Sequence, residues 1–354
     1  ITPQKNVIWL AHSIELVEQA AAGFEEVWKH LGSHDVNVRV VDGARDGLLD
    51  IDSDSESSFV VSTLQSMCSY LEKTPDDFFR FSKSCSLLIV DEAHMSLAPT
   101  YKNLIEKIVE DGCLLMGLTA TPGRNIDAAK DNQQLAALYF QTPVRLTCPD
   151  DGNVFAYLRK IGVMARTTMT TIAGSRARLT VAELVAFENK LSIPTSVLNR
   201  LASEDQRNLQ IIQKLLDLLE ENEHRKILLF ACSVKHSKFL ASICKLKGLR
   251  AAHVDGGTSS LARQTILSNF KSGEVNILTN YGVLATGFDA PKTDVVFIAR
   301  PTASIVLYSQ IIGRGLRGPN IGGTEKCLIV NVADNIEGLP DYNEIYDYFD
   351  DYYI

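Results

Sequence analysis

Short apolar runs alternate with amphipathic stretches along most of this chain. In the first part, apolar runs at 7–10, 36–41, 59–61, 87–90 and 113–118 are separated by helical patterns such as 14–28 and 103–110. Runs of four to eight apolar residues are typical of buried strands, and a spacing of three to four is typical of helices packed on a sheet. The alternation predicts an α/β fold with a mostly parallel, doubly wound sheet.

The same alternation returns in the second half after an irregular stretch. We expect strands at 226–230, 250–254, 275–279, 295–299 and 327–332, with helices at 209–222, 236–247, 260–270 and 304–312. A chain of 354 residues is long enough for two domains with separate cores. We therefore expect a first domain over 1–149, a partly helical inter-domain connection over 150–207, a second domain over 208–332 and an acidic, aromatic-rich tail over 333–354.

Charge and cysteine usage change this picture little. The net charge of −8 arises mostly in 333–354, which holds seven acidic residues and no Lys or Arg, so the overall charge neither favours nor excludes nucleic acid. The seven cysteines are scattered, without a C-x-x-C pair, and are expected to be core residues in a reducing compartment. No apolar stretch approaches the ~18 residues of a membrane span, and no signal peptide is visible. We expect a cytoplasmic protein without a membrane partner.

The first candidate chemistry follows the strand at 87–90. Asp91 and Glu92 come directly after it, in the sequence D-E-A-H. Ligands of open α/β sheets bind at the carboxyl ends of the strands, where one carboxylate can hold Mg²⁺ and the other can orient or deprotonate a water. An Asp-Glu pair that only caps the next helix would fit this local pattern equally well.

Three further segments follow predicted strands or a helix. These are T-A-T-P at 119–122, T-N-Y-G-V-L-A-T-G-F-D-A-P at 279–291 and Q-I-I-G-R-G-L-R at 310–317. In the last, Arg314 and Arg317 lie among glycines that would let the backbone approach a ligand, and guanidinium groups suit phosphate because they donate paired hydrogen bonds. Taken alone, these arginines would more often mark a solvated helix end.

Together these segments resemble the superfamily 2 helicases and translocases. The similar stretches, in chain order, are 7–19 (motif Ia), 60–66 (Ib), D-E-A-H (II), T-A-T-P (III), 227–231 (IV), 279–291 (V) and 310–317 (VI). T-A-T-P with a motif VI that begins with Gln is most similar to the DNA-directed type III restriction and RadD-like group. The resemblance implies two RecA-like domains, ATP and Mg²⁺ as cofactors, and DNA in preference to RNA as the partner, with further protein partners possible.

The resemblance also implies roles for matching positions. Asp91 would coordinate Mg²⁺, Glu92 would position or deprotonate the attacking water, and Arg314 and Arg317 would act as arginine fingers. His94 and Gln310 would link the nucleotide site to the domain interface, and Gly287 and Asp289 would face the nucleotide. The residues expected to couple ATP to nucleic acid or to contact its backbone are Ser62, Thr63, Gln65, Thr119, Thr121 and Thr279. For Ser62, Thr63 and Thr279, an ordinary helix cap is an equal alternative.

One expected motif does not occur in this sequence. The phosphate loop G-x-x-x-x-G-K-S/T, which the family carries just upstream of motif Ia, is absent from the 354 residues. We interpret the chain as a motor core that lacks this segment, active as an ATPase or helicase only in the full-length protein and inactive by itself. The alternatives are an RNA helicase, or a non-catalytic protein that binds nucleic acid or protein.

Overall fold

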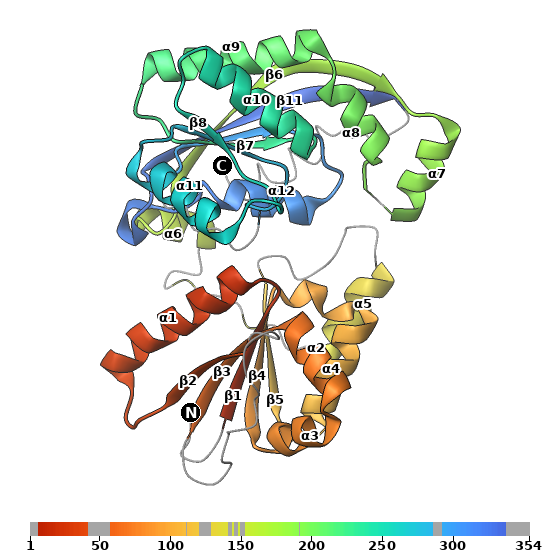
Figure 1. The fold of residues 1–354 in the computed structure, drawn as a ribbon, viewed down its shortest axis with the longest axis vertical. Coiled ribbons are helices and arrows are strands. Elements are labelled where there is room, and N and C mark those ends of the chain that lie inside the picture. Colours follow the sequence, from red (N-terminus) through yellow and green to blue (C-terminus); the bar gives the residue numbers. More distant parts are fainter. Residues whose placement is uncertain are drawn as a thin grey trace. The chain divides into compact units, whose positions relative to one another are not determined.

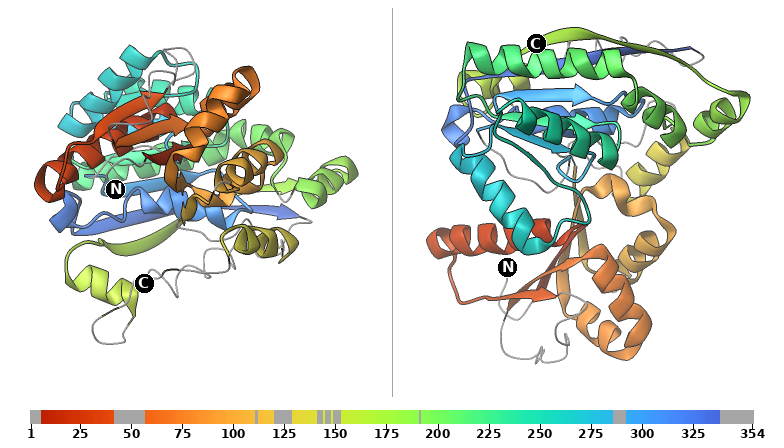
Figure 2. Two further views of the ribbon diagram at one scale, coloured as in Figure 1. Left: turned by 90° about the horizontal axis from the view of Figure 1, so that it is seen from below. Right: turned by 45° about the horizontal axis from the view of Figure 1, so that its top comes forward.

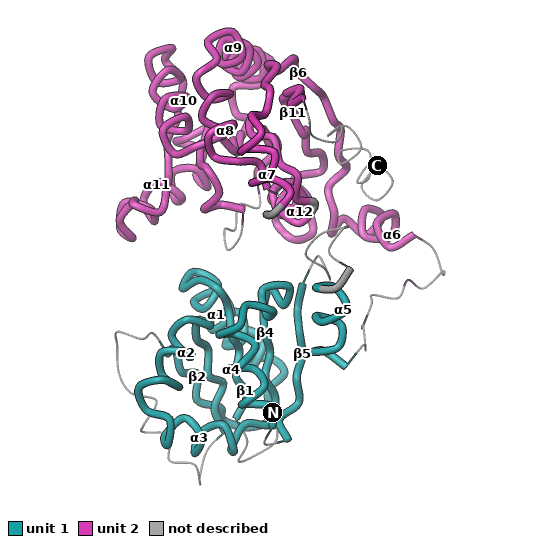
Figure 3. The backbone as a smooth tube through the Cα atoms, turned by 90° about the vertical axis from the view of Figure 1, so that its right-hand side faces the viewer, with its two compact units in different colours: residues 1–144 teal, residues 145–354 magenta. Residues whose placement is uncertain are grey.

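The computed structural model describes residues 6–41, 57–110, 112–119, 129–140, 144, 148, 153–190, 192–285 and 292–337. The chain divides into two compact units, residues 1–144 and 145–354 (Figure 3). Each unit contains its own sheet and its own apolar core.

The first unit is built on five strands in the order β2-β3-β1-β4-β5, and every neighbouring pair is parallel. The strands are β1 (Asn6–Ala11), β2 (Asn37–Val41), β3 (Ser58–Thr63), β4 (Cys85–Asp91) and β5 (Leu114–Leu118). All five runs predicted as strands are confirmed. Helices follow β1, β3 and β4 and return the chain to the same end of the sheet, which makes these strands parallel.

Helices cover both faces of this sheet, but unequally (Figure 1). On one face, α1 (Ile14–Leu31) is the only helix among the described residues, and it packs against β1, β2 and β3. The other face is covered by α2 (Leu64–Lys73), α3 (Pro75–Lys83) and α4 (Pro99–Val109), and a 3-10 turn, η2 (Ala93–Leu97), and α5 (Ala129–Leu138) complete the unit. The sequence analysis missed α3, although its signals are present: Pro75 in the first turn, followed by two acidic residues.

The second unit contains six parallel strands in the order β6-β11-β10-β7-β9-β8. They are β6 (Arg166–Arg178), β7 (Ile227–Ala231), β8 (Ala251–His253), β9 (Ile277–Asn280), β10 (Val295–Ala299) and β11 (Lys326–Glu337). One face is covered by α9 (Asp205–Glu221) and α10 (Val234–Leu246), the other by α11 (Ser260–Ser272) and α12 (Ile305–Gly313). The remaining elements are α6 (Val154–Lys160), α7 (Val181–Lys190), α8 (Thr195–Ala202) and the turn η3 (Pro319–Ile321) (Figures 1 and 2).

The segment predicted as a connection, 150–207, contributes a strand to this second sheet. Strand β6 pairs with β11 from Arg166–Lys326 to Arg178–Glu337, so that it forms the edge of the sheet. Its sequence is rich in Thr, whose β-branched side chain favours an extended backbone. This range therefore lies within the second unit rather than between two domains.

The predicted acidic tail also begins inside the sheet, because β11 continues to Glu337. Asp334 is buried, and both of its carboxylate oxygens accept hydrogen bonds from Arg207, at 2.7 Å from Nε and 2.8 Å from Nη2. Arg207 also donates to the Ala299 carbonyl at 2.8 Å, and Asp334 accepts from the Ser175 amide at 3.0 Å. This fully buried ion pair joins α9, β6, β10 and β11. Residues 338–354 lie outside the described residues.

Replacing Asp334 by Ala is expected to destabilise the second unit by about 3–5 kcal/mol, because the guanidinium of Arg207 would stay buried without its counter-charge. The free energy of unfolding, measured with urea, checks this. The matched control is Glu337→Ala on the same strand, where an exposed carboxylate faces Arg178 at 3.7 Å and a loss of at most ~1 kcal/mol is expected. Equal losses in the two variants would contradict the assignment.

A neutral histidine lies next to this ion pair in the core. Burial lowers the pKa of His236 to about 3. Its Nδ1 accepts from the Cys232 amide at 3.2 Å, and its Nε2 lies 2.9 Å from Asn208 Oδ1. These partners suit the neutral ring, which places the proton on Nε2.

The unit is therefore expected to lose stability as the pH falls below ~6.5, because unfolded His236 takes up a proton that the folded state does not bind. From pH 7 to pH 5 the contribution of this residue is about 2 kcal/mol, at ~1.4 kcal/mol per pH unit. Urea unfolding at both pH values should show a weaker pH dependence in His236→Gln. Exposed His224, replaced in the same way, should leave the dependence unchanged, and an equal effect of both variants would contradict the expectation.

Among the described residues, no helix combines the length and the hydropathy that crossing a bilayer requires.

Candidate functional site

The carboxyl ends of the parallel strands gather several of the predicted residues at one edge of the first sheet. Asp91 is the last residue of β4 and pairs with Leu118 of β5, so Thr119 follows at the same level. His12 follows β1, and Thr63 ends β3. The structure thus brings D-E-A-H and the start of T-A-T-P together, as the position of ligand sites in α/β sheets predicts.

The two carboxylates of D-E-A-H have different surroundings. Burial raises the pKa of Asp91, while the hydrogen bond from the Glu92 amide, 2.9 Å long, and the nearby charge of His12 act in the opposite direction. Glu92 has a left-handed backbone (φ 51°, ψ 50°), which is costly for a residue with a Cβ and often occurs at functional sites. A cation would stabilise the charge on the partly desolvated Asp91 carboxylate.

His94 connects Glu92 to the end of β5. The residue is 7% exposed, and its Nδ1 lies 3.3 Å from Glu92 Oε2 and 3.2 Å from Thr119 Oγ1. It can therefore hold the Glu92 carboxylate in place and transmit a shift of Thr119 to it. The role of His94 toward the second domain stays a prediction.

Two residues that the sequence analysis missed, Tyr139 and Gly117, lie against the turn η2 that follows Glu92. The Tyr139 hydroxyl lies 2.8 Å from Ser96 Oγ, and burial raises the pKa of Tyr139 to about 12. Gly117 leaves room for this arrangement, since a Cβ there would lie 2.6 Å from Tyr139 Cε1 and 2.8 Å from Ala93 Cβ. Tyr139 follows α5 in a segment without a recognisable motif, so only the tertiary structure identifies it.

The residues predicted to grip nucleic acid in the first unit differ in accessibility. The Ser62 hydroxyl is buried and donates to the Val41 carbonyl at 2.9 Å. Thr63 Oγ1 accepts the Ser66 amide at 3.0 Å and so caps α2, which agrees with the helix-cap alternative. Gln65 is exposed. Thr121, Gly287 and Asp289 lie outside the described residues.

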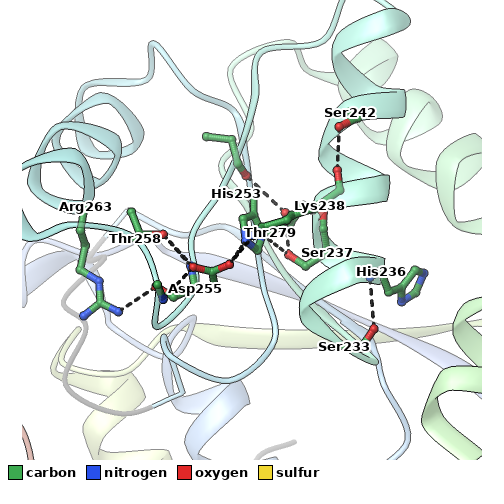
Figure 4. Close-up of polar contacts among 12 residues, drawn as sticks. Ser233, His236, Ser237, Lys238, Ser242, His253, Asp255, Thr258, Arg263 and Thr279 are labelled. Carbon is green, nitrogen blue, oxygen red and sulfur yellow. Dashed lines mark hydrogen bonds and ion pairs between the residues drawn. The ribbon is translucent and has the colours of Figure 1, made fainter. Parts of the chain in front are cut away.

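In the second unit, Thr279 is part of an internal polar network (Figure 4). It is fully buried, and its Oγ1 donates to the Ser237 carbonyl at 3.0 Å and accepts from Ser237 Oγ at 2.9 Å. Ser237 Oγ lies 2.7 Å from His253 Nδ1, whose Nε2 lies 3.0 Å from Asp255 Oδ2. The hydroxyl predicted to contact a phosphate is thus used inside the unit.

Asp255 is the charged end of this network. Its hydrogen bonds from His253 and then Lys238, whose Nζ lies 2.8 Å from Oδ2, hold the pKa of Asp255 well below its usual range. It also accepts from Thr258 and the Gly257 amide, so it fixes the turn that leads into α11. The sequence analysis gave no role to Lys238, His253 or Asp255; the available signal was H-V-D-G-G at 253–257, which begins inside the strand predicted at 250–254.

The predicted arginines follow α12. Arg314 caps the helix, and its Nε donates to the Gln310 carbonyl at 3.3 Å. The main chain of Arg317 forms a β-bridge with Met164, and its carbonyl accepts a hydrogen bond from the Thr324 amide at 2.9 Å. The half-buried side chain therefore extends from a main chain that is held in place. Asp91 and Glu92 belong to the other unit.

The glycines beside these arginines pack against the protein itself. A Cβ at Gly315 would overlap Cys327 Sγ, and one at Gly318 would overlap the Gly162 carbonyl. We expected these glycines to let the backbone approach a ligand. At these two positions packing inside the unit is sufficient to require glycine, because the sheet and the turn before β6 occupy the space of a side chain.

Comparisons with known proteins agree with this architecture. The family "Type III restriction enzyme, res subunit" matches residues 2–124, and "Helicase conserved C-terminal domain" matches residues 209–318. The putative ATP-dependent helicase IRC3 of Saccharomyces cerevisiae is 27% identical over 312 residues, which cover 87% of this chain and 40% of that protein. The ATP-dependent rRNA helicase RRP3 of Candida albicans is 25% identical over 216 residues, 58% of this chain and 40% of that one. The chain thus spans about two fifths of the length of these relatives.

Solved structures show the same fold at low sequence identity. The DNA-bound helicase MrfA aligns with a TM-score of 0.64 at 13% identity, over 99% of this chain and 43% of the other. A DEAD-box helicase bound to single-stranded RNA aligns at 0.59 and 18% identity, over 99% and 63%. The prediction of two RecA-like α/β domains is confirmed.

The two family matches and the relatives support a superfamily 2 helicase core, and the match over residues 2–124 supports the group that resembles the type III restriction enzymes.

Proposed function

We propose that this chain is the motor core of an ATP-dependent DNA helicase or translocase, in which ATP is hydrolysed between the two RecA-like domains. The observation that carries the proposal is the cluster of Asp91, Glu92, His94 and Thr119 at the carboxyl edge of the first sheet. Asp91 and Glu92 have different surroundings, and His94 links Glu92 to Thr119 at the end of β5. This arrangement suits ATP hydrolysis coupled to movement better than it suits the capping of a helix.

Asp91 and Glu92 suit a Mg²⁺ ion that is bound jointly by the protein and by the phosphates of a nucleotide. Within the described ranges, no group of three or more His, Cys, Asp or Glu side chains could hold a metal. Mg²⁺ usually needs only one or two carboxylates together with substrate phosphates, and Asp91 supplies a desolvated one. Mg²⁺ bound there would neutralise charge on the β- and γ-phosphates. Glu92, oriented by His94, would position or deprotonate the attacking water.

The second unit would complete the site. Arg314 and Arg317 would donate to the transferred phosphoryl group, and Gln310, Gly287 and Asp289 would line the nucleotide from the same side, as the resemblance implies. Thr119 and Thr121 would couple the nucleotide to the bound nucleic acid. The nucleic acid would be held through its phosphate backbone by Thr63 and Gln65 and by main-chain groups near Ser62 and Thr279. The hydroxyls of Ser62 and Thr279 are themselves engaged in hydrogen bonds inside their units.

The edge of the first sheet favours the proposal that a further strand, which would carry the phosphate loop, pairs with β5. Strand β5 is the edge of the sheet as described, and three of its apolar side chains are exposed, Leu114 to 71%, Met116 to 47% and Leu118 to 37%. By register they share a face with Leu87 and Ile89, the face on which α1 packs mainly against β1, β2 and β3. This leaves an exposed apolar area over β5.

The handedness of crossovers indicates what would cover that area. In this sheet, the connection that runs from β1 toward β2 lies on the α1 face, and those that run toward β5 lie on the opposite face. A strand upstream of β1 that pairs with β5 would therefore send its right-handed crossover helix over Leu114 and Met116. Its carboxyl end would lie beside Asp91, where a phosphate loop is required.

DNA is favoured by the match to the type III restriction family and by the Gln that begins motif VI. An RNA helicase is the second candidate, because RRP3 and other relatives are named as RNA helicases. Protein partners of the full-length chain remain part of the proposal.

The test is the ATPase rate of the full-length protein with single-stranded DNA, duplex DNA and RNA. We expect the largest stimulation by DNA. Stimulation by RNA alone would favour the second candidate. Failure of every nucleic acid to stimulate hydrolysis, in a protein that carries the phosphate loop, would reject the motor function and leave a non-catalytic binding protein.

A further inference from the structure

Two buried cysteines lie side by side at the start of β4 and β5. The sulfur atoms of Cys85 and Cys113 are 3.2 Å apart and share a hydrogen bond, and the two side chains are 7% and 4% exposed. Both belong to the core between the first sheet and helices α2 to α4. All seven cysteines are free thiols in this structure.

The backbone geometry suits a disulfide. Strand β4 has an irregularity between Cys85 and Leu87, and Cys113 directly precedes β5, whose Leu114 pairs with Leu87, so the two cysteines lie on neighbouring parallel segments and face the same core. Neighbouring strands lie ~4.8 Å apart, which is compatible with the roughly 4.4–6.8 Å between Cα atoms that is usual for disulfides. The sulfurs need to approach by only ~1 Å, which side-chain rotation can supply.

One of the two thiols is also activated by the other. The hydrogen bond between the two sulfurs lowers the pKa of the Cys113 thiol, while burial acts in the opposite direction. Thiolates are the species that react with peroxides and disulfides.

We propose that Cys85 and Cys113 are an oxidation site at which hydrogen peroxide forms an intramolecular disulfide. The Cys113 thiolate attacks one peroxide oxygen, which breaks the O–O bond and, with one proton, releases water and leaves a sulfenic acid. The Cys85 sulfur then attacks the oxidised sulfur, the S–S bond forms, and the hydroxyl leaves as a second water with the Cys85 proton. The two thiols lose two electrons and peroxide gains two.

The bond would close a loop that contains D-E-A-H, η2 and α4. It would fix β4 against β5 at the ends opposite Asp91 and Thr119, so both strands would remain intact up to the site. In a reducing compartment the pair would return to thiols, as expected for cytosolic disulfides that respond to oxidants.

The experiment is peptide mapping of the folded protein after hydrogen peroxide, with remaining thiols blocked before trypsin digestion. The expected product joins peptides 84–102 and 108–124, has lost two hydrogen atoms and separates after treatment with dithiothreitol. Cys85→Ser and Cys113→Ser should each abolish it. Cys68→Ser should retain it, since the Cys68 thiol is directed to the Thr100 carbonyl.

The wild-type map decides the question even if a variant folds poorly. Peroxide treatment in urea is expected to abolish the selectivity, because the folded sheet holds the sulfurs together. Oxidation of either cysteine to sulfinic acid without the cross-linked peptide, or a cross-link of Cys68 in preference to this pair, would overturn the proposal.

Discussion

Replacing Arg314 or Arg317 by Ala is expected to lower the DNA-stimulated ATPase rate of the full-length protein by ~10³-fold or more, the size of effect that arginine fingers supply. The physical reason is that a guanidinium stabilises charge that develops on the transferred phosphoryl group. The main chain at Arg317 is held independently, by the bridge to Met164 and by the Thr324 amide. Loss of the side chain should therefore leave the fold intact.

Steady-state ATPase kinetics measure this effect, and the thermal midpoint shows whether each variant is folded. Arg178→Ala is the matched control, because that side chain is 86% exposed and contacts only the exposed Glu337 among the ion pairs described. Arg317→Lys should restore little, since an ammonium cannot donate in the same paired geometry. Rates within threefold of wild type in both Ala variants would remove these arginines from the site.

Replacing Glu92 by Gln is expected to lower the rate of ATP hydrolysis by about 10²–10⁴-fold while ATP still binds, because the amide keeps the shape but cannot accept a proton. Single-turnover hydrolysis and binding of a fluorescent ATP analogue separate these two effects. The amide can still lie near His94 Nδ1, which is 3.3 Å from the native carboxylate. Binding should therefore change far less than hydrolysis.

The control for Glu92 is Glu106→Gln, a half-exposed residue of α4 that faces Lys102 at 3.7 Å. It should behave as wild type. If Glu92→Gln loses ATP binding and hydrolysis together, the carboxylate would act in holding the nucleotide or the metal, a role assigned here to Asp91. Normal hydrolysis in Glu92→Gln would reject its role as base.

The sequence by itself determined the strands, their parallel arrangement and the position of D-E-A-H at a strand end. These features are local: an apolar run at 87–90 has the period and length of a buried strand wherever it lies, and the residue after it must emerge at the sheet edge. For the same reason, β10 was predicted with the bounds that the structure shows. Motif order then gave the family resemblance.

Only the tertiary structure decided which side chains meet. Arg207 pairs with Asp334, 127 positions away, and neither residue carries a local signal of burial. Ser62 and Thr279 were predicted to contact a nucleic-acid backbone or to cap a helix, yet neighbouring elements bury both and use their hydrogen bonds. The pairing of β6 with β11, the overlap that excludes a side chain at Gly315, and the adjacent sulfurs of Cys85 and Cys113 are of the same kind. Local propensity fixes an element, whereas the partner of a buried group depends on how distant elements pack, and that information is distributed over the whole chain.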